Sequence, residues 1–247
     1  MDLGISGKRA VVAASTSGLG LATAVALADA GCTVVINGRT DERLAAAQPK
    51  VAGSIPVAGD LSTTAGAEAF IDAAADALGG IDILITNAGG PPPGNFAETD
   101  IGAYAAALEM NLVSMAAMCK KVVPGMQAEQ WGRIVAITST SVHTPMPNLI
   151  LSNTARLWLS SLLKSLALEV VGDGITVNTA QPGLHLTPRV TDLYQGSVEA
   201  LAEQQPTGRV GDADDFGQVV AFLCSNQANY ITGVSIPVDG GRFTQLQ

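Results

Sequence analysis

The chain contains few aromatic, charged and cysteine residues for its length. Of its 247 residues 4% are aromatic and 14% are charged, with 13 Lys and Arg against 22 Asp and Glu. The formal charge of −9 argues against a nucleic acid or an anionic membrane as partner. Cys32, Cys119 and Cys224 lie far apart without metal-ligand spacing. We therefore expect neither disulfides nor a metal site, but reduced thiols in a cytoplasmic protein.

Long apolar runs are also missing. No uninterrupted run reaches the roughly 18 residues that a membrane span needs, so no transmembrane helix is predicted. The first residues, MetAspLeuGly, have no basic start followed by an apolar stretch, so no signal peptide is expected. Hydrophobic residues are abundant, at 47%, and there are 27 glycines. This length and apolar content predict one sizeable α/β domain with many tight turns.

Short apolar runs alternate with longer helix-like segments along the whole chain. The expected strands cover residues 9–14, 33–37, 55–58, 81–86, 133–138, 175–180 and 234–238. The expected helices cover residues 21–30, 40–48, 63–78, 100–127, 149–171 and 212–225. This alternation predicts a doubly wound parallel sheet of about seven strands with helices on both faces. Ligands of such sheets bind at the carboxyl ends of the strands.

A glycine-containing turn, SerThrSerGlyLeuGly at 15–20, joins the first expected strand to the first helix. Backbone N–H groups at such a turn suit a pyrophosphate, although an ordinary strand-to-helix turn can have the same sequence. After the second strand comes Arg39, with no acid before Asp41. A basic residue there accommodates a 2′-phosphate, whereas an acid would bind a ribose hydroxyl. The sequence thus favours NADP(H) over NAD(H) as cofactor.

Further motifs follow the later strands in a specific order. They are Asp60-Leu61, Asn87-Ala88-Gly89, Asn111 in MetAsnLeuValSer, Ser139 after GlyArgIleVal, and Pro182-Gly183 with Thr187. Over nearly its whole length the chain resembles the short-chain dehydrogenase/reductase family, close to 3-oxoacyl-carrier-protein reductases. The resemblance implies one Rossmann-type domain with a substrate lid at about 184–206, and catalytic roles for Ser139 and Asn111. It implies that the cofactor is bound by Ser15, Thr16, Ser17, Gly18, Leu19, Gly20, Arg39, Asp60, Leu61, Asn87, Ala88, Gly89, Arg156, Pro182, Gly183 and Thr187.

The chain departs from this family at three positions. Ala14 stands where the glycine turn normally begins, and Ser152 and Arg156 replace the catalytic tyrosine and lysine. Arg156 can retain the ribose contact and the positive field, but a guanidinium does not release a proton at neutral pH. Ser152 can donate a hydrogen bond to a developing oxyanion, but it is a poor acid and shorter than a phenol. The standard proton donor is therefore missing.

Other side chains could replace the missing acid. His143 follows Ser139 in the loop that lines the substrate side in the family, and its ordinary pKa suits proton transfer. The alternative is an ordinary loop histidine. His185, in the loop that begins with Pro182-Gly183 (the ProGly loop), and Tyr194 in the lid are further candidates. Tyr104 and Tyr230 match structural aromatic residues of the family and are expected to pack.

These observations predict an atypical, ketoreductase-like NADPH-dependent oxidoreductase. It would transfer hydride to a carbonyl or conjugated alkene of a small or polyketide-like substrate. A non-redox enzyme that catalyses dehydration, elimination or cyclisation, or a cofactor-binding pseudoenzyme, are the alternatives. In the family the two helices expected at 100–127 and 149–171 pack across a twofold axis. A homotetramer is therefore expected, with a dimer as the alternative.

Overall fold

The computed structural model describes residues 1–193 and 197–244. The strands are β1 Arg9–Val12, β2 Thr33–Gly38, β3 Ile55–Ala58, β4 Ile83–Thr86, β5 Gly132–Ile137, β6 Ile175–Pro182 and β7 Ser235–Val238. The α-helices are α1 Gly18–Asp29, α2 Asp41–Ala47, α3 Thr64–Leu78, α4 Ile101–Leu108, α5 Ser114–Ala128, α6 Ile150–Val170, α7 Pro188–Leu193, α8 Val198–Glu203 and α9 Ala213–Leu223. Short helical turns cover Gln48–Lys50, Thr140–Val142 and Val171–Asp173, and a π-helical turn covers Glu109–Val113.

The seven strands form one sheet in the order β3-β2-β1-β4-β5-β6-β7. Every neighbouring pair is parallel. The prediction of a doubly wound parallel sheet is therefore confirmed. The chain winds outward from β1 in one direction and from β4 in the other. A crevice forms at the carboxyl ends of the strands where the winding reverses, and in such sheets ligands bind there.

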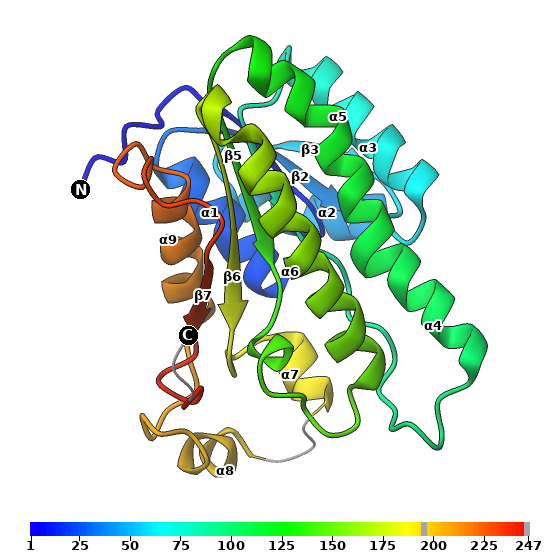
Figure 1. Ribbon diagram of the computed structural model, residues 1–247. Coiled ribbons are helices and arrows are strands. Elements are labelled where there is room, and N and C mark those ends of the chain that lie inside the picture. The colour runs from blue at the N-terminus through cyan, green and yellow to red at the C-terminus, as the bar shows by residue number, and fades with distance from the viewer. Residues whose placement is uncertain (194–196, 245–247) are drawn as a thin grey trace.

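Helices cover both faces of the sheet (Figure 1). On one face α1, α2 and α9 bury residues such as Leu27, Leu44 and Phe216 against the strands. On the other face α3, α5 and α6 do the same with residues that include Phe70 and Leu159. Both faces of the central strands are apolar because both are covered, as expected for a parallel sheet.

Local sequence sets several of the helix ends. Thr40 begins α2 by accepting a hydrogen bond from the Arg43 backbone N–H, and Thr63 caps α3 in the same way. Gly79 ends α3 with φ at +71°, a conformation that glycine adopts without steric cost. By contrast, the Ser17 side chain makes no capping hydrogen bond at the start of α1. Within the described part of the chain, the first N–H groups of α1 therefore have no side-chain cap from Ser17.

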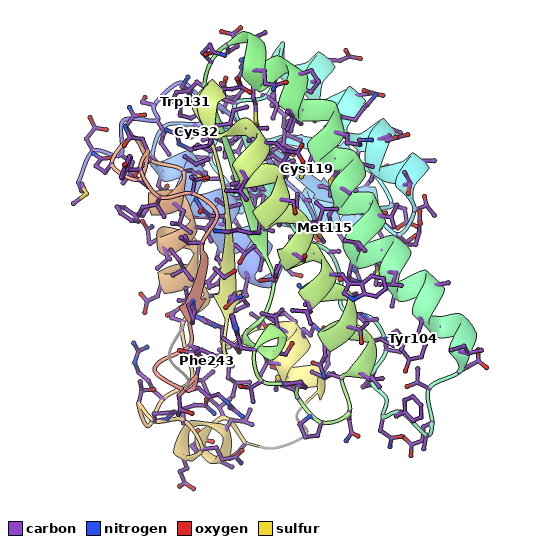
Figure 2. All side chains as sticks on the ribbon, viewed as in Figure 1. Cys32, Tyr104, Met115, Cys119, Trp131 and Phe243 are labelled. Carbon is purple, nitrogen blue, oxygen red and sulfur yellow. The ribbon has the colours of Figure 1, made fainter. Side chains whose placement is uncertain are left out.

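The single helix predicted over residues 100–127 is interrupted. The π-helical turn Glu109–Val113 separates α4 from α5, which the sequence did not indicate. Within the described residues, Ile101–Ala128 is the one helical stretch that could cross a membrane by length and composition, with mean hydropathy 1.3. Figure 2 places Met115 and Cys119 on α5, and both are buried in the core against the sheet. One side of α5 therefore packs against the sheet.

The segment predicted as a lid, residues 184–206, holds α7 and α8 beyond the carboxyl ends of the strands (Figure 1). Tyr194, a candidate proton donor, lies outside the described residues. Tyr104 lies on α4 (Figure 2) and is partly buried. The prediction that Tyr230 packs against other residues is wrong within this chain, because Tyr230 is 98% exposed.

Candidate active site

A cavity of about 460 Å³ lies at the carboxyl ends of β1 to β6. It brings together most of the predicted cofactor-binding residues. Those that line it are Thr16, Ser17, Gly18, Leu19, Gly20, Arg39, Asp60, Leu61, Asn87, Ala88, Gly89, Arg156, Pro182, Gly183 and Thr187. Six segments that are far apart in the sequence thus meet in one site.

Ser15 is the exception among the predicted cofactor-binding residues. It is fully buried and does not line the cavity. Its hydroxyl donates a hydrogen bond to the Val12 carbonyl at 2.7 Å and accepts one from the Asn37 backbone N–H at 2.9 Å. Ser15 therefore joins the end of β1 to β2, and its side chain has a structural role.

Ala14 begins the turn in an unusual backbone conformation, with φ at +46°. Two asparagine side chains hold it there. The Ala14 N–H donates to Asn37 Oδ1 at 3.1 Å, and its carbonyl accepts from Asn87 Nδ2 at 3.2 Å. A non-glycine residue in the left-handed region is strained and persists only where its surroundings fix it. The glycine turn keeps its shape despite the alanine because Asn37 and Asn87 hold both polar groups of this residue.

Two arginine side chains line the end of the cavity that lies beside the carboxyl end of β2. Arg39 follows β2, and Arg43 lies in the first turn of α2, so both line the same end of the cavity. Both side chains are exposed. Asp60 and Leu61 line the same cavity after β3. The prediction from sequence named Arg39 and missed Arg43, although its spacing of four residues was a usable signal.

Ser139, Ser152 and Arg156 come together at the other end of the cavity, where β5 meets α6. Arg156 Nε donates to Ser152 Oγ at 3.2 Å, and its Nη1 donates to the carbonyls of Ile137 and Thr138 at 2.9 and 3.0 Å. The Arg156 side chain thus turns back over the end of β5 while still lining the cavity. Burial, with a smaller effect from the charge of Arg189, lowers its pKa to about 10. It is a cation at neutral pH.

The two serine hydroxyls keep their donor hydrogens available. Ser139 Oγ accepts a hydrogen bond from the Ser141 backbone N–H at 3.1 Å, and Ser152 Oγ accepts from Arg156. A serine hydroxyl has one donor hydrogen in addition to its acceptor lone pairs. Both hydroxyls can therefore donate to an oxygen atom bound in the cavity.

Asn111 lies in the π-helical turn, fully buried and outside the cavity lining. Its Nδ2 donates to the Ala107 carbonyl at 3.3 Å, and its Oδ1 has no hydrogen-bond partner among the described residues. Its neighbour Met110 lines the cavity. Single π-helical turns occur often at functional sites, so this position agrees with a site nearby.

The structure places His143 away from the cavity lining. Its Nε2 lies 3.0 Å from Gln181 Oε1, and its ring contacts that of Phe243 at 4.7 Å between centroids. Figure 2 shows Phe243 in the segment after β7. The ring is therefore directed toward Gln181 and Phe243, and this geometry does not favour proton transfer in the cavity by His143.

His185 is the histidine that lines the cavity. It is 4% exposed, packs edge-on against Phe216, and has Nδ1 3.4 Å from the Gly183 carbonyl oxygen. Burial lowers its pKa below the ordinary value, and the Gly183 carbonyl and nearby carboxylates offset part of that effect. It is therefore neutral at physiological pH.

Comparison with known proteins gives the same assignment as the geometry. The family model for enoyl-(acyl carrier protein) reductase matches residues 13–242. The chain is 34% identical over 248 residues to 3-oxoacyl-[acyl-carrier-protein] reductase FabG of Aquifex aeolicus, covering 98% of this chain and 100% of that relative. The chain belongs to the short-chain dehydrogenase/reductase family. The resemblance inferred from the motifs is confirmed.

Two solved reductase structures share the fold of this family member. L-sorbose reductase from Gluconobacter frateurii, complexed with NADPH and L-sorbose, matches with TM-score 0.92 and 32% identity over 100% of both chains. YwfH, an NADPH-dependent reductase involved in bacilysin biosynthesis, matches with TM-score 0.91 and 28% identity, covering 98% and 100% of the two chains. The family is one of oxidoreductases that use a nicotinamide cofactor on small molecules, so the protein is assigned to that class.

The residues present fit a nicotinamide cofactor. At Gly89 an added Cβ would meet no protein atom within 4 Å, so this backbone borders open space in the cavity. Gly18 has φ at +56° and lies beside Thr187, so the glycine turn and the ProGly loop face each other. The N–H groups at the start of α1, left without a side-chain cap by Ser17, can bind a pyrophosphate.

Arg189 is a site residue that the sequence reasoning missed. It lies on α7 and lines the cavity, and its Nη2 donates to the Pro91 carbonyl at 3.2 Å. Its guanidinium covers Gly90, where any side chain would collide with it. Burial lowers its pKa from the ordinary value, and Asp192 partly offsets this. Its position two residues after Thr187 was the only signal in the sequence.

Proposed function

We propose that the protein is an NADPH-dependent oxidoreductase that transfers hydride to a carbonyl or a conjugated alkene of a small substrate. One observation carries the proposal: a single cavity joins the glycine turn, the Arg39–Arg43 end and the Ser139–Ser152–Arg156 end. YwfH, which is NADPH-dependent, and L-sorbose reductase, which was solved with NADPH, support the choice of cofactor. When bound, the cofactor supplies the hydride.

The protein residues then have distinct roles. Thr16 to Gly20 and the start of α1 bind the pyrophosphate, while Arg39 and Arg43 bind the 2′-phosphate. Arg156 holds the nicotinamide ribose and provides a positive field near the reacting atoms. Ser139 and Ser152 donate hydrogen bonds to the substrate oxygen where negative charge develops, which typically contributes about 3–4 kcal/mol per donor. Asn111 is proposed to support this region from the π-helical turn.

The absence of a strong acid favours one branch of this chemistry. Reduction of a ketone needs a proton on a strongly basic alkoxide oxygen. Hydride addition to a conjugated alkene gives an enolate, whose charge is spread over several atoms and is less basic. Two serine hydroxyls and a nearby cation can stabilise an enolate without proton transfer, and water can protonate the carbon later. The pair Ser152 and Arg156 therefore suits a conjugated alkene better than a simple ketone.

The cofactor assignment is tested by calorimetric titration with NADPH and NADH. Wild type is expected to bind NADPH more tightly. In the double variant Arg39→Ala, Arg43→Ala that preference should fall by about 10–100-fold, because charge-assisted hydrogen bonds contribute about 1.5–3 kcal/mol. Lys50→Ala, an exposed cation near α2 outside the cavity lining, is the control. Equal NADPH preference in the double variant, or no NADPH binding to wild type, would refute the proposal.

A non-redox reaction on the same fold is the second candidate. The observation that favours it is the Ser152 hydroxyl, which is bonded to Arg156 and replaces the proton donor of the family. Turnover of a substrate without any change in the nicotinamide absorbance band would support this candidate. Stoichiometric loss of NADPH with product formation would exclude it. Cofactor binding without turnover of any substrate would indicate a pseudoenzyme.

A further inference from the structure

The charges lining the cavity are opposite in sign to the charge of the protein. The chain carries 22 acidic and 13 basic residues, with a formal charge of −9. In the described structure, four of those basic residues line the cavity and one acidic residue does. The cations are Arg39, Arg43, Arg156 and Arg189, and the acid is Asp60. A cationic cavity in an acidic protein concentrates anionic ligands from solution.

The bound cofactor would satisfy only part of this charge. Its phosphates fit the glycine turn and the Arg39–Arg43 end. Arg156 and Arg189 lie at the opposite end, over the carboxyl ends of the neighbouring strands β5 and β4. The nicotinamide ribose near Arg156 is uncharged. Two cations therefore remain at the end of the cavity where the substrate would be bound.

Neither of these arginines forms an ion pair within residues 1–193 and 197–244. The ion pairs in that part of the chain are Arg9–Asp82, Lys121–Asp72 and Arg209–Asp215. Arg156 is 9% exposed, and its described partners are two carbonyls and a hydroxyl, all neutral. A buried cation without a counter-ion is costly unless an anion binds beside it. The positive charge of Arg189 also disfavours the charged form of Arg156, although Arg189 itself is exposed and has the Asp192 carboxylate nearby.

The space beside these cations is apolar on its other side. Ser152 replaces a tyrosine, so its short side chain leaves room where a phenol ring would lie. Met110, Met146 and Leu149 line the same cavity. A ligand for this region needs a charged group at one end and a flat or apolar body at the other. Arginine binds planar carboxylates especially well, through two parallel hydrogen bonds.

We infer that the substrate carries a carboxylate that binds between Arg189 and Arg156, with its apolar body against Met110, Met146 and Leu149. This inference rests on the proposed function and names the class of its substrate: unsaturated or oxo carboxylic acids rather than neutral ketones or sugars. Arg189 is the specificity-determining residue, since Arg156 is also needed for the cofactor. α7 provides this residue, and its contact with Pro91 O holds it over the cavity.

The test uses the full chain saturated with NADP⁺ and two probes of equal shape, trans-cinnamate and trans-cinnamamide. Calorimetry is expected to show the acid binding at least tenfold more tightly than the amide. Arg189→Gln should reduce that ratio to about one, and Arg189→Lys should keep part of it. Arg209→Gln, a matched removal of an arginine outside this cavity, should leave the ratio unchanged. The preference should also weaken as salt concentration rises.

Several results would overturn the inference. They are equal binding of acid and amide to wild type, no binding of either, or an unchanged ratio in Arg189→Gln. A fourth is loss of NADP⁺ affinity in Arg189→Gln comparable to the loss for the acid, which would assign Arg189 to the cofactor. Failure of the proposed function itself gives a separate result, because wild type would then not bind NADP⁺ at all.

Discussion

Replacing Ala14 by glycine should stabilise this protein, although most alanine-to-glycine changes destabilise. Ala14 has φ at +46°, where an L-residue with a Cβ costs about 1–2 kcal/mol. Glycine removes that strain but gains about 0.5–1 kcal/mol of chain entropy in the unfolded state. The difference is about 0.5–1 kcal/mol in favour of the variant. For a chain of this size it corresponds to a rise in Tm of about 1–4 °C.

Two control variants separate strain from other effects. Gln130 also has a positive φ, at +52°, but is exposed in the turn before β5, so Gln130→Gly should stabilise to a similar extent. Ala13 is fully buried and is not among the residues with positive φ, so Ala13→Gly should destabilise by about 0.5–1 kcal/mol or more. Urea unfolding monitored by circular dichroism measures all three.

The variants also differ in their effect on the cofactor. Ala14 lines the cavity beside the glycine turn, whereas Gln130 does not. Ala14→Gly removes a methyl group from the cavity wall, so NADPH affinity should rise in this variant. It should stay constant in Gln130→Gly. If Ala14→Gly loses stability as Ala13→Gly does, the strain attributed to this turn is wrong, and the packing of the Ala14 methyl group against the core outweighs it.

Two further predictions concern titratable groups of the site. Arg156→Ala should raise the Kd for NADPH by about 10–100-fold in calorimetry, since it removes a charged hydrogen-bond donor; an unchanged Kd would exclude Arg156 from the cofactor site. Burial lowers the pKa of His185 in the folded protein. Above about pH 6.5 the side chain is therefore neutral in both the folded and the unfolded protein, and its titration does not change the free energy of unfolding. As pH falls below that value the unfolded chain binds the proton more readily, and stability is lost. His185→Gln should therefore lose less unfolding free energy than wild type between about pH 7.5 and 5; an equal loss would refute this.

The fold was predictable because it depends on short-range patterns. Strands buried on both faces read as apolar runs, and helices end at residues such as Gly79, so the element order follows from the sequence. The π-helical turn at Glu109–Val113 was not predictable, because its residues fit an ordinary helix. The turn puts Asn111 in the interior beside the site, and that constraint comes from tertiary packing rather than from local sequence.

The site was predictable where motif and geometry agree. Asn87 and Ser139 follow strand ends, and parallel strands bring their carboxyl ends to one edge. Ser15 shows the limit of a motif: it lies within the glycine turn, yet its hydroxyl is used to join β1 to β2. Arg189 is the opposite case: it belongs to no motif, and it lines the site only because α7 runs across the cavity and brings it to Pro91.

The substitutions at 152 and 156 are structurally linked. The guanidinium of Arg156 makes three hydrogen bonds, through Nε to Ser152 Oγ and through Nη1 to the carbonyls of Ile137 and Thr138. A lysine has one terminal nitrogen and no donor equivalent to Nε, so it could not bond to Ser152 and both carbonyls in this geometry. A tyrosine at 152 would in turn deprive Nε of its short-range acceptor, because its hydroxyl lies a ring length away from the backbone. The pair therefore forms one unit in which the cation is fixed at the end of β5, and the space normally filled by the phenol is left for a ligand.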